Sequence, residues 1–236
     1  MVMPLWDHTP FKWPTPPYVM WLLIVVNFIV FFLQVGGGLR EMILEDHFLG
    51  LIPLALIGHA VGGLWSPLTL ITYQFLHSNF MHVLGNMIFL FVFGDDIEEV
   101  LGHWRFLVFY LLCGIGAGLV FVLSAPDLQQ PLIGASGAIA GVISAYLLFR
   151  PCAKVTCLLG LIPLRVRAYW IICIWAIWQL VEAAGRVQNG VAYWGHVGGL
   201  ITGAALFIMM RPSGVKLFDC AHSEPVLVAG KFEPPS

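Results

Sequence analysis

Four polar residues in otherwise apolar segments could do chemistry together. Ser136 lies in "GASGA", His196 in "WGHVGG", and His82 and Asn86 lie four residues apart in "FMHVLGNM". A serine hydroxyl is a weak nucleophile until a neighbouring base takes its proton, and a neutral imidazole suits that task near pH 7. No aspartate or glutamate accompanies these residues in their segments. The predicted catalytic pair is therefore a Ser136–His196 dyad without an acidic third member.

Acyl transfer also needs hydrogen-bond donors where negative charge develops on the substrate. His82 and Asn86 share one helical face because they are four residues apart. The backbone N–H of Ser136, near the start of a helix, is a third donor. We expect these three groups to form the oxyanion and substrate-binding part of the site.

The segments that must position these residues are apolar enough to cross a membrane. The chain has 236 residues, of which 59% are hydrophobic and 10% charged, whereas soluble domains have about 25% charged residues. A helix needs about 20 apolar residues to span the hydrocarbon core. The sequence therefore predicts an all-α polytopic membrane protein, and a net charge of -2 gives no support for nucleic-acid binding. Six transmembrane helices are expected, at 18–35, 80–93 with an apolar approach from 68, 104–123, 135–149, 168–184 and 193–210.

Lysines and arginines predict the orientation, because they are retained on the cytoplasmic side. With six spans, Arg40 and Arg186 fall on one side and the other nine fall on the opposite side. Residues 1–17 and 211–236 are then cytoplasmic tails around a membrane domain at 18–210. The four polar residues lie at one depth, toward the extracytoplasmic side. The Gly-rich connection at 36–79 is expected to be a structured loop in the membrane interface.

Small residues indicate how the helices approach each other. Gly137 and Gly141 form a G-x-x-x-G row just after Ser136, which Gly134 precedes, and Gly199 and Gly203 share a helical face with His196. Such rows let helix backbones pack closely. We expect the fourth and sixth helices to bring Ser136 and His196 to hydrogen-bond distance.

Simpler interpretations exist for each residue. Ser136 alone could bond a carbonyl one turn earlier or join two helices, and His82 with Asn86 could anchor a loop. Their agreement in depth favours a site. A metal site from His77, His82 and His196 is disfavoured, because histidines five residues apart share a helical face poorly; no metal or cofactor is expected, and His77 is predicted to hold the 36–79 loop. The five cysteines form no CxxC pair, so inert thiols rather than a disulfide framework are expected.

Four motifs in order, "HSNFMHVLGNM", "GDDIEEVLGHWRFLVFYLLCG", "GASGAIAG" and "GHVGG", resemble those of the rhomboid intramembrane serine proteases of the bacterial six-span type. The resemblance covers roughly residues 18–210. It implies Ser136 as nucleophile, His196 as general base, and His82, Asn86 and the Ser136 amide at the oxyanion. It also implies single-span or multi-span membrane protein substrates that enter laterally from the lipid bilayer of a bacterial inner membrane.

One position departs from the family pattern. Some members carry an aromatic residue four positions after the serine, where its ring packs on the histidine, and here that residue is Ala140. Tyr146 is too far along the helix to replace it, so Trp194 or an aromatic of a neighbouring span is expected to support His196. Glu98 and Arg105 match the family's charged turn and are expected to be structural.

Two other classes of function remain open beside a protease. A catalytically inactive relative would bind membrane clients for quality control or trafficking; such relatives usually lack the serine or the histidine, and both are present here. A small transporter would need polar residues through the full depth of the bundle, whereas here they cluster on one side.

Overall fold

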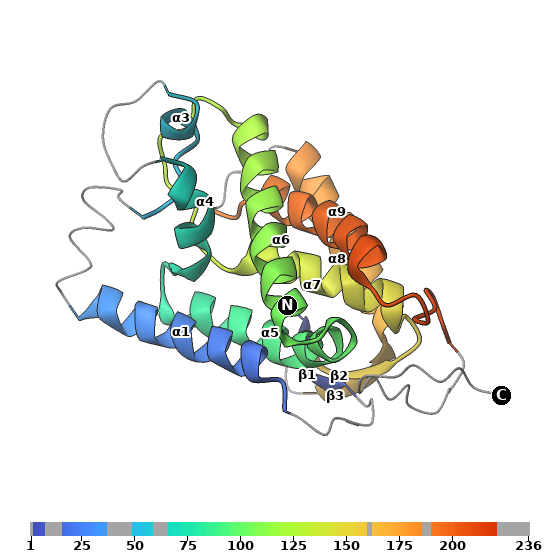
Figure 1. The fold of residues 1–236 in the computed structure, drawn as a ribbon. Helices are drawn as coiled ribbons and strands as arrows, with labels where there is room; N and C mark the ends of the chain where they lie inside the picture. Colours follow the sequence, from blue (N-terminus) through green and yellow to red (C-terminus); the bar gives the residue numbers. More distant parts are fainter. Residues whose placement is uncertain are drawn as a thin grey trace.

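In the described part of the chain, six apolar helices form the body of the protein, and Figure 1 shows how they are arranged. The structure is a computed structural model that describes residues 2–7, 16–36, 49–58, 66–159, 162–185 and 190–220. The helices agree with the predicted segments, except that the second continues about two turns further than expected. Their bounds are α1 Tyr18–Val35, α5 Phe80–Leu101, α6 His103–Ser124, α7 Ser136–Phe149, α8 Ala168–Ala184 and α9 Tyr193–Met210.

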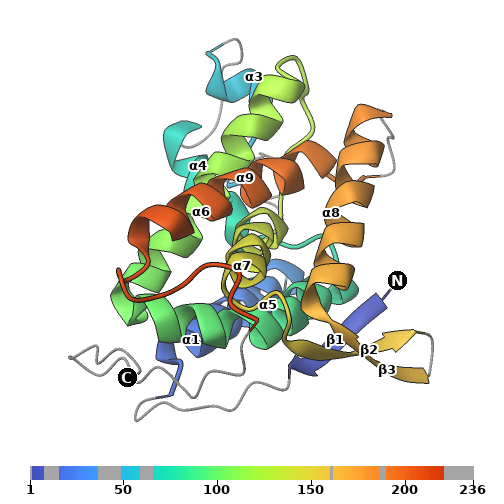
Figure 2. The same cartoon turned by 90° about the vertical axis from the view of Figure 1, so that its right-hand side faces the viewer.

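The helices differ in their capacity to span a membrane. In the described part of the chain, α1, α5, α6 and α9 are long and apolar enough to cross a bilayer, whereas α7 and α8 are apolar but shorter, at 14 and 17 residues. Residues 137–146 of α7 are all buried, and Figure 2 shows α7 in the middle of the bundle. A helix enclosed by other helices has its ends covered by protein, so it need not match the lipid thickness. The fold is therefore a polytopic helical membrane bundle around α7.

Glycines allow α7 and α9 to pack backbone against backbone. The ideal Cβ positions of Gly199 and Gly203 would overlap the backbone of Gly137 and Gly141 respectively. On another side of α7, a Cβ at Gly141 would lie 2.5 Å from the Sγ of Cys113 in α6. The predicted small-residue contact between these helices is thus present.

The connection between α1 and α5 is partly ordered into short helices: α3 Pro53–Leu56, η1 Ser66–Leu68, α4 Thr69–Thr72 and η2 Tyr73–Phe75. Leu51 and Leu132 exchange backbone hydrogen bonds of 3.1 and 2.8 Å, which joins this connection to the segment that precedes α7. The predicted structured loop is therefore present where it is described. The charged run at 39–47 lies outside the described residues.

A three-stranded antiparallel sheet was not expected from the sequence, and it corrects the all-α prediction. The sheet consists of β1 Val2–Asp7, β2 Lys154–Leu159 and β3 Ile162–Arg167, paired in the order β1–β2–β3. It lies at the N-terminal end of α8 (Figure 2). Along β2, Val155, Thr156 and Cys157 are all buried, so side chains on both faces of this strand are covered. Residues 2–7 are thus a strand rather than part of a solvent tail.

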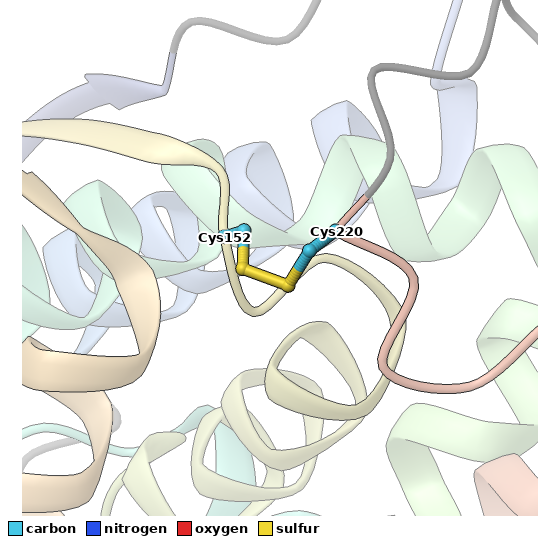
Figure 3. The surroundings of a disulfide bond; sticks show 2 residues. All are labelled: Cys152 and Cys220. Atoms are coloured by element: carbon cyan, nitrogen blue, oxygen red, sulfur yellow. A yellow bond between two sulfur atoms is a disulfide. The ribbon is translucent and has the colours of Figure 1, made fainter.

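The segment after α9 is also tied to the bundle. Cys220 forms a disulfide with Cys152, just after α7 (Figure 3), and the Phe218 N–H donates to the Leu148 carbonyl at 2.7 Å. The expectation of inert thiols is wrong for these two cysteines. Their pairing depends on how the chain returns after α9, and the sequence gives no spacing signal for it. Cys113 and Cys157 are free and buried.

Glu98 joins three helices at the opposite end of α5 from its start. Its carboxylate accepts the backbone N–H groups of Val19 and Met20 at 3.0 and 2.7 Å, and it lies 2.5 Å from the His103 imidazole. Pro17, the N-cap residue of α1, makes no side-chain capping hydrogen bond, and a negative charge is favourable at this helix end. This contact bears out the structural role expected for Glu98, while Arg105 is exposed.

Candidate active site

Ser136 is the first residue of α7, and the turn before it depends on glycine. Gly134 has φ +125°, a conformation that other residues rarely adopt. A Cβ at Gly134 would also lie 2.9 Å from the His82 imidazole. The Gly134 N–H donates to the Tyr73 carbonyl at 2.9 Å, which fixes the turn against η2. The N–H of Ser136, in the first turn of its helix, has no partner within that helix.

Ser136 and His196 form a hydrogen bond across the packed helices. Ser136 Oγ lies 2.8 Å from His196 Nε2, and His196 is in the first turn of α9. The glycine contacts between α7 and α9 allow this approach, because both helices start at the same end of the bundle. The sequence predicted this distance, and the structure places the two residues accordingly.

Two residues of α8 contact the other side of His196. The Oε1 atom of Gln179 lies 2.6 Å from His196 Nδ1, and the Trp175 ring centre lies 5.9 Å from that of His196, at an interplanar angle of 34°. Of the two alternatives expected for supporting His196, the ring contact that the structure shows is with an aromatic of a neighbouring helix, Trp175. Gln179 was missed from the sequence, although a polar residue inside an apolar helix is a signal of function.

His82 and Asn86 face the turn before Ser136. The His82 ring contacts Gly134, and Asn86 Nδ2 would lie 3.8 Å from a Cβ at Gly134. His82 Nδ1 is 3.1 Å from the hydroxyl of Ser78, and Asn86 Nδ2 donates to His77 Nε2 at 2.9 Å. The structure thus gathers all four residues that the sequence singled out around one turn.

His77 lies behind this site, in the loop that precedes α5. Its backbone N–H donates to Gln34 Oε1 of α1 at 3.1 Å, which joins this end of the 36–79 connection to α1, while the loop-holding role predicted for the His77 side chain stays a prediction. Burial, together with the nearby His82 imidazole, lowers the pKa of His77 to about 3. His77 is therefore neutral at ordinary pH, and its Nε2 can accept the Asn86 amide proton.

The arrangement has the parts of a serine-nucleophile site. It contains a hydroxyl, an imidazole in contact with it, an orienting group on that imidazole, and amide and imidazole groups beside the nucleophile. Among the described residues, no three His, Cys, Asp or Glu side chains are grouped so that they could hold a metal ion.

Comparison with known proteins identifies the family. A profile of the rhomboid domain matches residues 61–213, more than half of the chain. The protein therefore belongs to the rhomboid family.

Relatives of this chain occur in bacteria, plants, yeast and human. The chain is 31% identical over 188 residues to Rhomboid protease GluP of Bacillus subtilis. This alignment covers 79% of the present chain and 34% of GluP. It is 30% identical over 169 residues to RHOMBOID-like protein 6, mitochondrial, of Arabidopsis thaliana, covering 70% and 52%. For Rhomboid protease AarA of Providencia stuartii the identity is 29% over 154 residues, covering 56% and 52%. The chain thus matches about half or less of each relative's length.

Proposed function

We propose that this protein is an intramembrane serine endopeptidase that hydrolyses a peptide bond in or near a transmembrane segment of another membrane protein. The observation that carries the proposal is the 2.8 Å contact between Ser136 Oγ and His196 Nε2. Membership of a family that includes relatives named as proteases supports the same activity.

The reaction would proceed in two acyl-transfer steps. Ser136 Oγ attacks the scissile carbonyl carbon while His196 Nε2 takes its proton. The tetrahedral intermediate then collapses, the C–N bond breaks, and the same proton passes to the leaving amine. A water molecule, deprotonated by His196, attacks the serine ester. The ester C–O bond then breaks, the imidazolium returns the proton to Ser136 Oγ, and the new carboxyl terminus is released. The oxyanion in each step would be stabilised by the Ser136 N–H together with His82 and Asn86.

The substrate class follows from the location of the site in an apolar bundle. A peptide carbonyl in an intact membrane helix is already hydrogen-bonded within that helix. The substrate segment must therefore unwind locally, and small or helix-breaking residues near the cut would favour unwinding. Single-span or multi-span membrane proteins entering from the bilayer are the expected substrates.

We further propose six spans, with both termini cytoplasmic and the site facing the extracytoplasmic side of a bacterial inner membrane. The lysine and arginine distribution supports this orientation. The test is a reporter domain that is active only when it lies in the cytoplasm. Fused after residue 236, it should be active if this orientation is correct.

The test is to co-express a panel of tagged single-span substrates with the wild type and with Ser136→Ala and His196→Ala. Only the wild type should release a cleaved product, and a fluorophosphonate probe should label the wild type but not Ser136→Ala. As a matched control, Ser144→Ala removes a buried hydroxyl of the same helix, which donates to the Gly141 carbonyl, and should leave both readouts unchanged. Cleavage that survives either dyad substitution would defeat the proposal.

An inactive rhomboid-like protein that binds clients is the alternative. It would capture the same substrates in the wild type and in Ser136→Ala without cleaving them in either. The hydrogen-bonded serine and histidine favour the enzyme, because client binding requires no nucleophile.

A further inference from the structure

A histidine can act as the base toward Ser136 in only one of its two neutral forms. His196 must carry its proton on Nδ1, so that the lone pair of Nε2 faces the hydroxyl. In the other form, Nε2–H would face the serine and could not accept its proton. The site therefore needs a group that selects the first form. In the part of the chain that the structure describes, the hydrogen bonds of the imidazole are to Gln179 and Ser136, and neither is a carboxylate.

We propose that Gln179 is the positioning residue that selects this form, and that Trp175 sets the plane of the imidazole. This inference rests on the proposed protease function. A carboxamide oxygen can only accept a hydrogen bond. With Gln179 Oε1 at 2.6 Å, Nδ1 carries the proton, and Nε2 is free to accept the Ser136 O–H at 2.8 Å.

Burial makes the selection effective. Gln179 is 5% exposed, so water has little access to replace it as the acceptor for Nδ1. An amide inside an apolar helix is costly unless it is hydrogen-bonded, and its bond to His196 meets that requirement. The hydrogen bond therefore orders both side chains together.

Trp175 and Gln179 are four residues apart, so they lie on one face of α8. The indole lies beside the imidazole while the carboxamide holds its Nδ1 end. Ala140 is fully buried and has only a methyl group, which provides no ring surface for His196. In this protein α8 thus supplies both the aromatic ring that packs beside His196 and the hydrogen-bond acceptor for its Nδ1.

A neutral amide differs from an acidic third member in one measurable respect. It orients the imidazole but adds no negative charge to stabilise the protonated imidazolium. Replacing it by a carboxylate should therefore extend the protonated state of His196 to higher pH, while keeping the acceptor in place.

The experiment compares Gln179→Met and Gln179→Glu with the wild type in reconstituted vesicles. Gln179→Met keeps the volume but removes the acceptor, so kcat should fall on the order of 10- to 100-fold, with KM little changed, as when a group orienting a functional histidine is lost. Gln179→Glu should recover most of kcat at high pH, and the acidic limb of its pH profile should move upward by about one unit or more. Labelling by a fluorophosphonate should slow in parallel for Gln179→Met.

Gln74→Met is the matched control, because Gln74 is also buried, but its amide donates to the Leu70 carbonyl, whereas the Gln179 amide bonds His196. It should lower thermal stability without moving the pH profile. Full kcat in folded Gln179→Met, or an unmoved acidic limb in Gln179→Glu, would overturn the positioning role. The Glu variant alone decides the matter if the Met variant does not fold. Ser136→Ala, assayed in parallel, tests the protease function separately: activity there defeats the dyad itself.

Discussion

The α-carbon of Gly199 faces the backbone carbonyl of Gly137 so closely that a methyl group at position 199 would overlap the carbonyl oxygen. Gly137 directly follows Ser136, and Gly199 lies one turn after His196. The separation of the two helix backbones at this contact therefore sets the distance between the hydroxyl and the imidazole. Geometry of this kind is sensitive, because a displacement of about 1 Å can cost 10²-fold in rate.

Gly199→Ala should consequently lower both stability and turnover. Overpacking of this kind costs about 1–3 kcal/mol, and the displaced helices should reduce the rate on the order of 10²-fold or more. Thermal denaturation and substrate cleavage measure the two effects. Gly85→Ala is the control, because a Cβ at Gly85 of α5 meets nothing within 4 Å and alanine favours the helix. Equal behaviour of the two variants would contradict the argument.

Asn86→Ala should lower kcat on the order of 10²-fold with little loss of fold, as expected when one oxyanion donor is removed. Asn27→Ala provides a comparison, since Asn27 is also a buried asparagine but donates to the Leu23 carbonyl within α1. Its rate per folded molecule should equal that of the wild type. An unchanged rate in Asn86→Ala would exclude Asn86 from the site.

Stability should depend on His77 below about pH 6.5. Burial lowers the pKa of His77 from 6.5 to about 3, so between these values the unfolded state binds a proton that the folded state excludes. Stability is therefore full above pH 6.5 and decreases as the pH falls toward 3. In His77→Gln this contribution is absent, and the thermal midpoint should fall less steeply over the same range. Parallel curves for the two proteins would show that His77 is not excluded from protonation.

Glu98→Ala should destabilise the bundle, because it leaves two backbone N–H groups of α1 and the His103 imidazole without their acceptor. A loss of about 3 kcal/mol is expected for a buried charged group with several partners. Chemical or thermal denaturation measures it. Asp127→Ala removes an exposed carboxylate after α6 and should change stability by less than about 0.5 kcal/mol. Similar losses in both variants would contradict the anchoring role.

Much of the bundle was predictable because apolar composition and length determine membrane helices directly. The bounds of α1, α8 and α9 agree with the predicted segments. The second helix was predicted to stop at residue 93, just before the acidic run "GDDIEE". Two of its acidic residues are instead buried and paired within the bundle. Glu98 accepts a backbone hydrogen bond from α1, and Asp96 forms an ion pair of 2.8 Å with Arg150. These partners come from distant parts of the chain, so the sequence alone gives no sign of them.

The contact between Ser136 and His196 was predictable because glycine rows mark where helices pack. Gln179 was not predicted, because a neutral amide is a weaker sign of a third catalytic member than a carboxylate, and because α8 carries no small-residue row toward His196. The sheet was missed for another reason. Each strand has only six residues, and β1 is recognisable only through its pairing with β2.

That pairing has a consequence for biogenesis. Asp7 lies opposite Val155 in the sheet, so the first strand emerges from the ribosome long before its partner exists. Four of the six apolar helices, α1, α5, α6 and α7, must leave the insertion machinery while β1 remains unpaired at the membrane surface. An affinity tag or fluorescent protein fused before β1 would lie next to a strand that pairs late in synthesis. The carboxyl terminus is therefore the safer place for either fusion.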